Sequence, residues 1–370
     1  MHVLMTVNSA WNIYNFRLPV LDELLREGHK VTILAPQDEA VGKLLERGCA
    51  FISLPMDAAG LNPLNDFLLI RRLKRIFHRE RPDVILSYTI KNNIFGGFAA
   101  RSLNIPFIPN ISGLGTAFLS GGLIQKIAEK LYKQALTGVD TVFFQNLDDK
   151  ELFIERRLIA SHQAKLLPGS GINLQYFSPV PMPERGSQTS FLMIARLLRD
   201  KGVFEFVDAA RIMRAQGCDA RFKLLGAMGA KNRTAISSEL ISQWTDEGII
   251  EYLGQVSDVR PHIAEADCVV LPSYREGSPR TLIEAAAMAR PLIATNVPGC
   301  KDVIEDRTSG LLCTVRDSKS LAKAFETFMS LSLIERTAMG EAGRKRMERY
   351  FDQQHVVAAY DAAIQGALQQ

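Results

Sequence analysis

Two α/β domains, each a doubly wound parallel sheet covered by helices, are the fold that this sequence predicts. The chain has 370 residues, which is too long for one hydrophobic core of ordinary size and suits two domains. Short apolar runs alternate with helix-like segments in both halves, as in repeated βαβ units. A stretch rich in proline and glycine, residues 169–187, separates the two series.

The first series of elements predicts an N-terminal domain at residues 1–172. Its strands are expected at 2–7, 30–35, 83–87, 105–109 and 141–145, with a helix at 17–28 that ends at a glycine. Strands that are joined through helices run parallel, so these segments predict one parallel sheet.

The second series predicts a C-terminal domain at residues 189–351, after a linker at 173–188. Its strands are expected at 190–195, 221–225, 249–253, 268–271, 291–294 and 310–313. The closing segment, 352–370, has a helical pattern and is expected to join the first domain. Ligands of open α/β sheets bind beyond the carboxyl ends of the strands, so the residues just after each strand are the candidates for a site.

Composition excludes several classes of protein. The chain is 47% hydrophobic and 23% charged, as soluble globular proteins are. Residues 1–172 hold 20 Lys/Arg against 16 Asp/Glu, and the remainder holds 24 of each. This excess is too small for a nucleic-acid-binding protein, and no such module is visible. No apolar run approaches the roughly 20 residues of a membrane helix, and no secretory signal opens the chain, so a cytoplasmic protein is expected.

The segment E-G-S-P-R-T-L-I-E, residues 276–284, is the most informative in the chain. It follows an expected strand and is interpreted as a turn that leads into a helix, with Ser278 as the cap and Pro279 at the first helical position. The backbone N–H groups of Gly277, Ser278 and the first turn would then bind a phosphate.

Two carboxylates flank this helix start. Glu276 lies at the mouth of the helix, and Glu284 lies in an apolar stretch where a buried carboxylate needs hydrogen-bond partners. Ribose hydroxyls suit Glu284, and hydroxyls of a hexose suit Glu276. The alternative for each is an ordinary solvated glutamate. An anion cradle between two such carboxylates indicates a sugar-nucleotide site.

Two cations follow the expected strand at 190–195. Arg196 and Lys201 are separated by a turn, so both side chains can reach one diphosphate. The alternative is a solvated basic loop. Five scattered cysteines without a C-x-x-C pair predict neither a disulfide framework nor a zinc site. The chain also lacks a D-x-D triplet, which predicts a reaction without a metal ion and no cofactor.

The motifs A-R-L-L-R-D-K-G, C-V-V-L-P-S-Y and E-G-S-P-R-T-L-I-E-A together resemble the retaining glycosyltransferases of family 4. These enzymes have the GT-B fold, in which two doubly wound Rossmann-like domains face a central cleft. The resemblance implies that Arg196 and Lys201 contact the donor diphosphate, that Glu284 holds the ribose and that Glu276 contacts the transferred sugar. It further assigns the phosphates to the backbone of Gly277, Ser278 and Pro279, and the nucleoside pocket to Gly226 and Val256. Glu276, Arg196 and Lys201 are the expected catalytic residues.

Further segments, among them N-I-Y-N-F-R-L-P and I-K-N-N-I-F-G, resemble the bacterial enzymes that add N-acetylgalactosamine or a related hexose to an undecaprenyl-diphosphate-linked sugar. This implies a UDP-sugar donor and a lipid-linked acceptor. The chain lacks the glycine-rich loop and the His-Gly pair that many family members carry on the acceptor side, so no histidine role is assigned. The expected acceptor-side residues are Asn8, Ser9, Asn15, Lys91, Ser112 and Gly113.

A lipid-linked acceptor calls for a surface that meets the inner face of the membrane. Residues 66–81 carry six Arg/Lys against two acids, and five apolar residues lie at helical spacing among them. Such a helix can lie on anionic lipid, or it can be an ordinary surface helix whose apolar stripe enters the core. The residues expected at the membrane are Arg71, Arg72, Lys74, Arg75, Phe118 and Leu119.

Two other functions remain open from the sequence alone. One is a transferase of the same fold with a soluble acceptor, such as a sugar phosphate. The other is a relative that does not transfer sugars, such as an epimerase.

Overall fold

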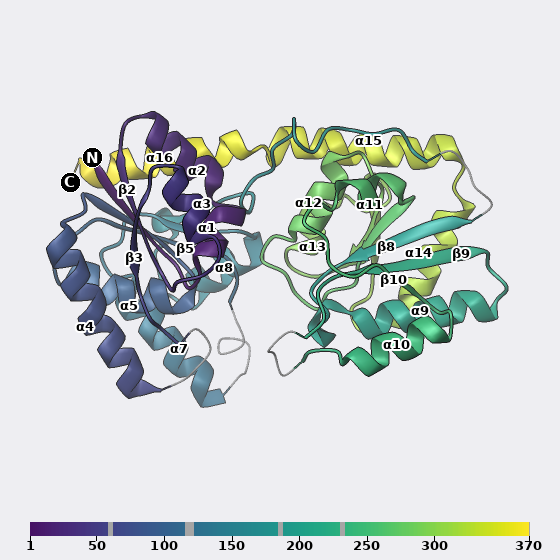
Figure 1. Ribbon diagram of the computed structural model, residues 1–370, viewed down its shortest axis with the longest axis horizontal. Helices are drawn as coiled ribbons and strands as arrows, with labels where there is room; N and C mark the ends of the chain where they lie inside the picture. The colour runs from purple at the N-terminus through teal and green to yellow at the C-terminus, as the bar shows by residue number, and fades with distance from the viewer. Residues whose placement is uncertain (58–61, 115–121, 184–187, 230–233, 370) are drawn as a thin grey trace. The chain divides into compact units, whose positions relative to one another are not determined.

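The computed structural model describes residues 1–57, 62–114, 122–183, 188–229 and 234–369. The chain divides into two compact units, one formed by Met1–Gly171 with Gln353–Gln370 and the other by Ile172–Asp352. Each unit is a parallel sheet with helices on both faces (Figure 1). The predicted fold class, two doubly wound parallel-sheet domains, is therefore confirmed.

The sheet of the first unit has seven parallel strands in the order β3-β2-β1-β4-β5-β6-β7. They are β1 (His2–Thr6), β2 (Lys30–Ala35), β3 (Ala50–Ser53), β4 (Val84–Tyr88), β5 (Phe107–Ile111), β6 (Val142–Phe144) and β7 (Ala164–Leu166). Strand β1 lies at the centre, because Val3 pairs with Val31 of β2 on one side and with Val84 of β4 on the other. The chain first builds one half of the sheet from β1 and then returns to build the other half from β4.

Helices cover both faces of this first sheet. They are α1 (Ala10–Phe16), α2 (Leu18–Arg26), α3 (Val41–Glu46), α4 (Pro63–Glu80), α5 (Ile90–Arg101), α7 (Gly122–Ala135), α8 (Leu147–Glu155), the short η1 (Ser161–Gln163) and α16 (Gln353–Leu368). Side chains of β1 alternate between the faces: Val3 and Met5 join the core beneath α2 and α16, whereas Leu4 joins the core beneath α4, α5 and α7. This alternation is what a strand buried on both faces requires.

The C-terminal helix α16 packs on the sheet of the first unit. Val356, Tyr360 and Ile364 recur every four residues on one face of the helix and are all buried in the core that contains Val3. The ring centroid of Tyr360 lies 4.8 Å from that of Phe143, and its hydroxyl accepts a hydrogen bond from the Asn110 amide. The last helix of the chain thereby completes the core that the first strand begins.

The sheet of the second unit repeats this topology with six parallel strands in the order β10-β9-β8-β11-β12-β13. They are β8 (Thr189–Ile194), β9 (Ala220–Leu225), β10 (Glu251–Tyr252), β11 (Cys268–Leu271), β12 (Leu292–Thr295) and β13 (Gly310–Cys313). Here β8 takes the central place, between β9 and β11.

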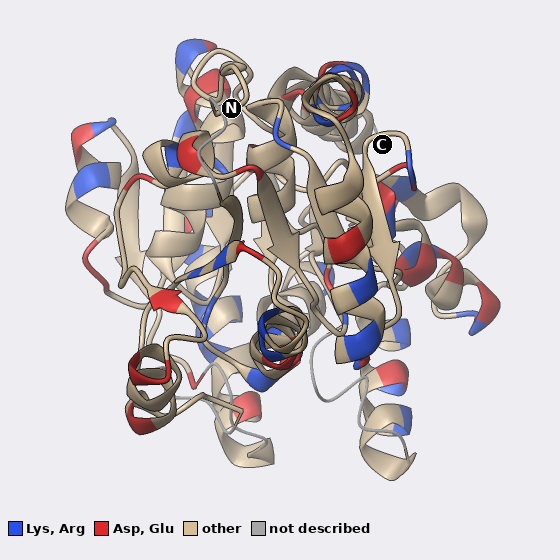
Figure 2. Cartoon of the chain, turned by 90° about the vertical axis from the view of Figure 1, so that its right-hand side faces the viewer, with Lys and Arg blue, Asp and Glu red and all other residues tan. Residues whose placement is uncertain are grey.

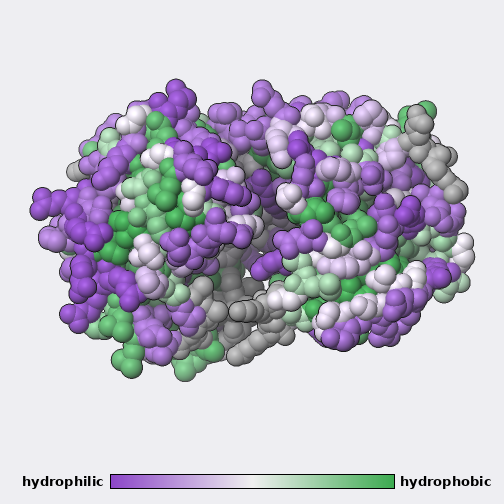
Figure 3. Space-filling view, in the orientation of Figure 1, coloured by the Kyte–Doolittle hydropathy of each residue, from purple (hydrophilic) through white to green (hydrophobic). Residues whose placement is uncertain are grey.

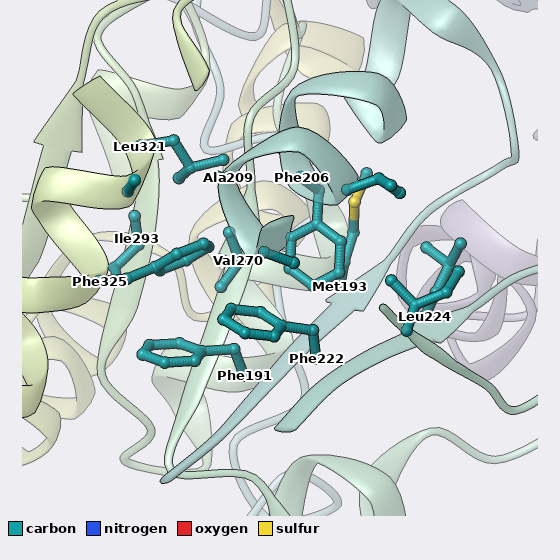
Figure 4. Close-up of a cluster of buried hydrophobic side chains, with 14 of the residues drawn as sticks. Phe191, Met193, Phe206, Ala209, Phe222, Leu224, Val270, Ile293, Leu321 and Phe325 are labelled. Carbon is teal, nitrogen blue, oxygen red and sulfur yellow. The ribbon is translucent and has the colours of Figure 1, made fainter. Parts of the chain in front are cut away.

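Two hydrophobic cores sandwich the second sheet. Its helices are the short η2 (Arg199–Lys201), α9 (Val203–Ala215), α10 (Ser238–Asp246), α11 (Arg260–Glu265), α12 (Arg280–Ala287), α13 (Cys300–Val303), α14 (Ser318–Ser330) and α15 (Leu333–Tyr350). On one face, Phe191 and Phe222 of the sheet pack with Phe206 of α9 and Phe325 of α14, as Figure 4 shows. On the other face, the apolar side of α12 packs on the sheet.

The segment expected as a linker, 173–188, is part of the second unit over the residues that are described, to 183. Phe177 is buried in its core. The fully buried Arg290, which follows α12, donates to the carbonyls of Val180 and Pro181 and to those of Ile263 and Ala264. Burial lowers the pKa of Arg290 to about 10, so the guanidinium remains charged at neutral pH. Four carbonyl dipoles compensate that charge and fasten the segment.

Several elements of the first unit, among them strands β3 and β7 and helix α1, are absent from the expectation based on sequence. Strands β3 and β7 are short and have exposed residues, so their apolar pattern is weak. Helix α1 begins at Ser9, whose hydroxyl caps it, within a loop that was expected to be irregular. Strand β5 is displaced by two residues from its expected position, because Ile105 and Pro106 precede it. For the three strands, pairing with a neighbouring strand rather than local pattern sets the element.

The molecular surface carries no large field of one sign in the view of Figure 2, where acidic and basic side chains are intermixed. The net charge of +4 agrees with this distribution. Over the described part of the chain, no helix combines the length and the apolar character that crossing a bilayer requires.

The buried guanidinium of Arg290 gives a direct test of the packing in the second unit. Arg290→Met would leave four enclosed carbonyls without donors, so we expect a loss of about 3 kcal/mol in the free energy of unfolding by urea. Arg221→Met is the control, since Arg221 is half exposed and pairs with Glu251 at the surface; we expect it to change the stability by less than about 0.5 kcal/mol. Equal stability of the two variants would contradict this account.

Candidate functional site

The strand order of the second unit brings together the loops that carry the sequence motifs. Strands β8 and β11 are neighbours, with Phe191 paired to Cys268 and Met193 to Val270. The chain leaves β8 toward β9 and leaves β11 toward β12, so the two connections diverge from the carboxyl ends of adjacent strands. Ligands of doubly wound sheets bind at such a switch point.

Lys201 and Glu276 meet at this switch point. Lys201 lies at the end of η2, after β8, and Glu276 lies in the loop after β11; the Lys201 Nζ is 2.5 Å from Glu276 Oε1. Their side chains are 19% and 12% exposed, so the pair is accessible but largely withdrawn from water. The structure thus brings together the cation and the carboxylate that the sequence places 75 residues apart.

The turn that carries Lys201 is fixed against the end of β11. The Asp200 carbonyl accepts hydrogen bonds from the Ser273 hydroxyl at 3.1 Å and from the Tyr274 N–H at 2.9 Å. Gly202 follows with a φ of +76°, and a Cβ there would lie 2.0 Å from the carbonyl oxygen of Pro272. Only glycine permits this close approach, which holds Lys201 beside the loop of Glu276.

Tyr274 is a residue of this site that sequence reasoning missed. Its hydroxyl donates to Glu205 of α9 at 2.8 Å, and the guanidinium of Arg316 lies 4.5 Å from its ring centroid. Burial, together with the hydrogen bond to Glu205, raises the pKa of Tyr274 to about 12, so the phenol stays protonated. In the sequence it is one tyrosine after a strand, and nothing local signals a partner 69 residues earlier in the chain.

Glu276 is held from the β12 side as well. Its N–H donates to the Pro298 carbonyl at 3.1 Å. Gly299 has a φ of +83°, and a Cβ at that position would lie 2.5 Å from the carbonyl oxygen of Glu276. The backbone of the Glu276 loop is therefore packed between the ends of β11 and β12.

The start of α12 differs from the expectation. Pro279 is the N-cap rather than the first helical residue, no side chain caps the helix, and Ser278 precedes it. The Pro279 carbonyl accepts from the N–H groups of Leu282 and Ile283, so the helix starts one residue later than predicted. Gly277, Ser278 and Pro279 still form the turn between Glu276 and the helix.

Glu284 is buried, as the apolar stretch around it predicts, but its partner in the structure is Arg280. The Arg280 Nε donates to Glu284 Oε1 at 2.6 Å across one helical turn. Burial raises the pKa of Glu284, the nearby Asp258 raises it further, and the charge and hydrogen bond of Arg280 lower it. The i, i+4 spacing of Arg280 and Glu284 in R-T-L-I-E is the sequence signal for this pair.

The remaining donor-side residues line the same edge of the sheet. Arg196 follows β8 and is exposed; its carbonyl accepts from the Leu198 N–H at 2.7 Å, and its guanidinium makes no hydrogen bond or ion pair within the described ranges. Gly226 follows β9; its carbonyl accepts from the Tyr252 hydroxyl at 2.8 Å, and a Cβ there would lie 1.9 Å from the carbonyl oxygen of Ala195. Val256 follows β10 and packs on the core beneath α12.

The expected acceptor-side residues belong to the first unit and have structural partners of their own. Ser9 caps α1, and the Asn15 amide donates to the Trp11 carbonyl. Lys91, in the first turn of α5, forms an ion pair of 2.9 Å with Asp66 of α4. Asn8 follows β1, and Ser112 and Gly113 follow β5, so these residues lie at the carboxyl edge of their sheet.

The basic helix predicted at 66–81 is α4, and most of its expected apolar stripe is not available to a membrane. Leu73, Ile76 and Phe77 are buried in the core of the first unit, so the alternative of an ordinary surface helix holds for this part. Phe67 is exposed. Arg71, Lys74 and Arg75 are exposed too, whereas Arg72 donates to the Pro55 carbonyl. Phe118 and Leu119 lie outside the described residues.

A search for metal sites gives no candidate in the portions of the chain that the structure describes. No three His, Cys, Asp or Glu side chains there gather closely enough to hold a metal ion.

Two family models match the chain, one in each unit. A model described as "Glycosyl transferase 4-like" matches residues 2–146. A model described as "Glycosyl transferases group 1" matches residues 188–330, which contain Lys201, Glu276 and Glu284.

Characterised bacterial transferases are similar over most of their length. The N,N'-diacetylbacillosaminyl-diphospho-undecaprenol alpha-1,3-N-acetylgalactosaminyltransferase of Campylobacter jejuni is 29% identical over 336 residues, covering 85% of this chain and 86% of that protein. The UDP-Gal:alpha-D-GlcNAc-diphosphoundecaprenol alpha-1,3-galactosyltransferase of Escherichia coli is 21% identical over 318 residues, covering 82% and 81%.

Among solved structures, HepE of Anabaena in complex with UDP-glucose has a TM-score of 0.78 and 17% identity. The match covers all of this chain and 99% of that one. At this identity the likeness concerns the fold.

The Arg280–Glu284 pair predicts a stability effect that depends on pH. Arg280→Gln removes the cation that holds the pKa of Glu284 down, so at pH above that pKa a buried carboxylate loses its partner. Because Arg280 is about a third exposed and water screens the pair, we expect a loss of only about 1 kcal/mol in the free energy of unfolding at pH 7.5. The loss should shrink as pH falls and Glu284 becomes protonated in both proteins.

The measurement is urea unfolding of both proteins at pH 7.5 and pH 5. Arg26→Gln is the control, because its partner Glu23 lies at the surface and gains little from the pair. A destabilisation by Arg280→Gln of the same size at both pH values would show that charge is not its cause.

Proposed function

We propose a reaction for this chain on the premise that it belongs to the GT-B glycosyltransferases, with a 4-like N-terminal region and a group 1 C-terminal region. It is a sugar transferase. The proposed donor is a nucleoside-diphosphate sugar, and the proposed acceptor is a sugar linked through diphosphate to a polyprenyl lipid. The proposed donor is more narrowly a UDP-hexosamine such as UDP-N-acetylgalactosamine. The anomeric configuration of the sugar is retained in the proposed transfer.

The observation that carries the proposal is the Lys201–Glu276 pair at the switch point of the second sheet. A lysine ammonium is a compact cation suited to a phosphate oxygen, and a carboxylate accepts hydrogen bonds from sugar hydroxyls. The two groups lie 2.5 Å apart, so a diphosphate bound to one places the attached sugar next to the other. A bound donor would separate Lys201 from Glu276. Its diphosphate would then contact Lys201, and a hydroxyl of its sugar would contact Glu276.

The charge that develops during transfer explains the cationic side of the site. The bond between the anomeric carbon and the β-phosphate oxygen breaks, the acceptor oxygen bonds to the anomeric carbon, and the proton of the acceptor hydroxyl passes to the leaving phosphate. Preorganised donors stabilise the charge of that phosphate in the transition state. Lys201 has this role in the proposal, with the exposed Arg196 and the backbone of Gly277, Ser278 and Pro279 as further donors, and no metal ion takes part.

Glu284 has the role of ribose ligand in this proposal. It lies two helical turns from Glu276 and is buried, and its Oε1 is already occupied by Arg280. Burial raises the pKa of Glu284 and Arg280 opposes that rise, so the ion pair favours the charged form, which is the stronger hydrogen-bond acceptor. Gly226 and Val256, after β9 and β10, are the proposed lining of the nucleoside pocket.

The names of the two bacterial relatives support the choice of acceptor. Both names specify an undecaprenol diphosphate that carries a sugar. The Campylobacter relative transfers N-acetylgalactosamine and the Escherichia relative galactose by name, which is why the donor sugar is part of the proposal.

A membrane-facing surface on the first unit agrees with such an acceptor. Six apolar side chains are exposed in the first turns of α4 and α7: Leu64, Phe67, Leu68, Leu123, Ile124 and Ile127. Figure 3 shows hydrophobic patches at the lower left of the molecule, the part where Figure 1 draws the lower ends of these helices. Exposed basic residues lie beside them in the sequence, among them Arg71 on α4 and Lys126 on α7. Apolar residues next to cations favour peripheral docking on an anionic bilayer. They support the proposal that the protein works at the inner face of the cytoplasmic membrane.

The Lys201–Glu276 pair is tested by transfer assays with a UDP-sugar donor and a short-chain polyprenyl-diphosphate sugar. Lys201→Ala and Glu276→Gln should each lower kcat by about a hundredfold, because each removes a contact to the charge or sugar that moves. Lys201→Ala should also weaken UDP binding in calorimetry. Lys223→Ala is the matched control, since Lys223 lies within β9 and its ammonium pairs with Glu265, away from the proposed donor site.

Normal turnover by either site variant would overturn the assignment. The same assay in excess EDTA should proceed at the full rate, and a strict metal requirement would count against the metal-independent reaction.

Membrane docking is tested by co-sedimentation with vesicles that contain or lack phosphatidylglycerol. The double variant Leu64→Ser, Phe67→Ser should lose most of the binding to anionic vesicles, because it removes two exposed apolar side chains, each of which contributes on the order of 2 kcal/mol when buried. Ile334→Ser, at an equally exposed apolar position on α15, should bind as the unaltered protein does. Equal binding by all three proteins, or binding without anionic lipid, would favour a soluble acceptor instead.

A further inference from the structure

We infer that Arg17 forms an anion-binding site at the switch point of the first unit, and that its ligand is a phosphate or diphosphate group of the acceptor. The assignment of the ligand to the acceptor rests on the proposed function, whereas the anion-binding site at Arg17 does not. Arg17 is the arginine of the segment N-I-Y-N-F-R-L-P and lies between α1 and α2, but the sequence assigned no role to it.

Arg17 lies at the switch point of the first sheet. It follows β1 by way of α1, and its guanidinium lies 4.6 Å from the ring centroid of Tyr88, the last residue of β4. Strands β1 and β4 are neighbours, with Thr6 paired to Ser87. The guanidinium is therefore held at the carboxyl edge of the sheet, where its two halves diverge.

This guanidinium is buried without compensation. Arg17 is 3% exposed, and no carboxylate pairs with it in the described ranges. Its Nε and Nη1 are enclosed and have no hydrogen-bond partner there. Burial raises the pKa of Tyr88 and of Tyr360, so these neighbouring phenols are neutral. A buried cation without partners is costly, and contact with one ring face does not replace hydrogen bonds for two N–H groups.

The second unit shows what is missing. At the same place in its sheet, the cation that follows the first strand, Lys201, meets the carboxylate of Glu276 from the loop after the fourth strand. In the first unit the residues that follow the fourth strand are Thr89, Ile90 and Lys91, and none of them is acidic. Arg17, the corresponding cation, contacts the aromatic ring of Tyr88, but no carboxylate of the described residues pairs with it.

A fully compensated buried arginine of the same chain sharpens the contrast. Arg290 donates to four carbonyls. Arg17 has a comparable burial and none of these contacts, so packing of the fold alone gives no reason for a charge at this position. An exogenous oxyanion would supply the missing acceptors, because phosphate oxygens match the planar fork of a guanidinium.

A second buried polar atom without a hydrogen-bond partner, on the same segment, indicates which other groups the ligand carries. The side-chain oxygen of Asn12, on α1, is enclosed and has no partner within the described ranges. It needs a donor, whereas Arg17 needs an acceptor. A sugar that carries a phosphate presents hydroxyl donors and phosphate acceptors together. The anion can come from a polyprenyl diphosphate or from a soluble sugar phosphate, and the experiment separates these sources.

Stability measurements distinguish a ligand site from a structural arginine. Arg17→Met removes the buried charge, keeps most of the volume and leaves a thioether that packs well on Tyr88. We expect a melting temperature equal to or above that of the unaltered protein, because no protein acceptor is left unpaired. Arg290→Met is the matched control and should melt at a clearly lower temperature. A similar fall for Arg17→Met would show that Arg17 has a structural partner and would overturn the inference.

Binding is measured with inorganic pyrophosphate as the probe, in a Lys201→Ala background that disables the proposed donor site. Pyrophosphate should raise the melting temperature of Lys201→Ala, and its affinity should fall at least about tenfold in the double variant with Arg17→Met, as expected for loss of a charged hydrogen-bond pair. Equal affinities would refute the site. If Lys201→Ala binds UDP as tightly as the unaltered protein, the proposed donor site fails while the result at Arg17 stands.

The source of the anion is identified by comparing two acceptors in the transfer assay. They are a short-chain polyprenyl-diphosphate sugar and the corresponding sugar 1-phosphate. With Arg17→Met, the KM for the acceptor that the unaltered protein uses should rise about tenfold, while the KM for the donor stays the same. Use of the lipid-linked compound alone identifies the polyprenyl diphosphate as the ligand. An unchanged acceptor KM would contradict the assignment to the acceptor.

Discussion

In each sheet the chain starts at a central strand, builds outward on one side, and returns to the centre to build the other side. Parallel pairing then sets the carboxyl ends of β1 and β4, and of β8 and β11, side by side, with their connections diverging. Ligands of doubly wound sheets bind at such points, where the connections diverge. The contacts that carry function in this molecule all depend on this one arrangement.

Close backbone packing converts that arrangement into a defined site. Gly202 and Gly299 bring the loops after β8 and β12 into van der Waals contact with the ends of β11 and its loop. The Lys201–Glu276 pair is therefore positioned by backbone that has little freedom to relax. The pair costs some desolvation in the absence of a ligand, and its partial exposure limits that cost. Groups that are organised before a ligand binds lose less entropy on binding, which suits the proposed nucleotide-sugar site.

Arginines in this molecule have two different uses. The fully buried Arg290 and the half-buried Arg344 donate to backbone carbonyls, Arg344 to those of Leu174, Phe177 and Ala287, and both fasten the segment that enters the second unit. Arg17 is buried nearly as deeply as Arg290, but among the described residues its guanidinium contacts the ring of Tyr88 and forms no hydrogen bond or ion pair. Arg290 and Arg17 differ in the number of hydrogen bonds that their guanidinium groups make rather than in burial. This difference separates arginines that stabilise the fold from Arg17, the proposed ligand-binding residue.

The sequence by itself determined the two parallel-sheet domains and the motif residues that follow their strands, because hydrophobic period and turn residues are local properties of the chain. It placed Lys201 and Glu276 correctly at strand ends, and it placed Glu284 in an apolar environment. It did not place strands β3 and β7, whose residues take their conformation from pairing with a neighbour. The first residue of α12 also differed by one position, since the Pro279 carbonyl receives the first helical hydrogen bonds.

Only the tertiary structure decided which side chains meet. Tyr274 contacts Glu205, Lys201 contacts Glu276, and the apolar stripe of α4 enters the core over most of its length. The role of Arg17 became visible only from the acceptors it lacks. Local pattern sets which way a residue faces within its own element. Contacts between elements depend on strand order and packing, which the free energy of the whole fold selects and no short window of sequence encodes.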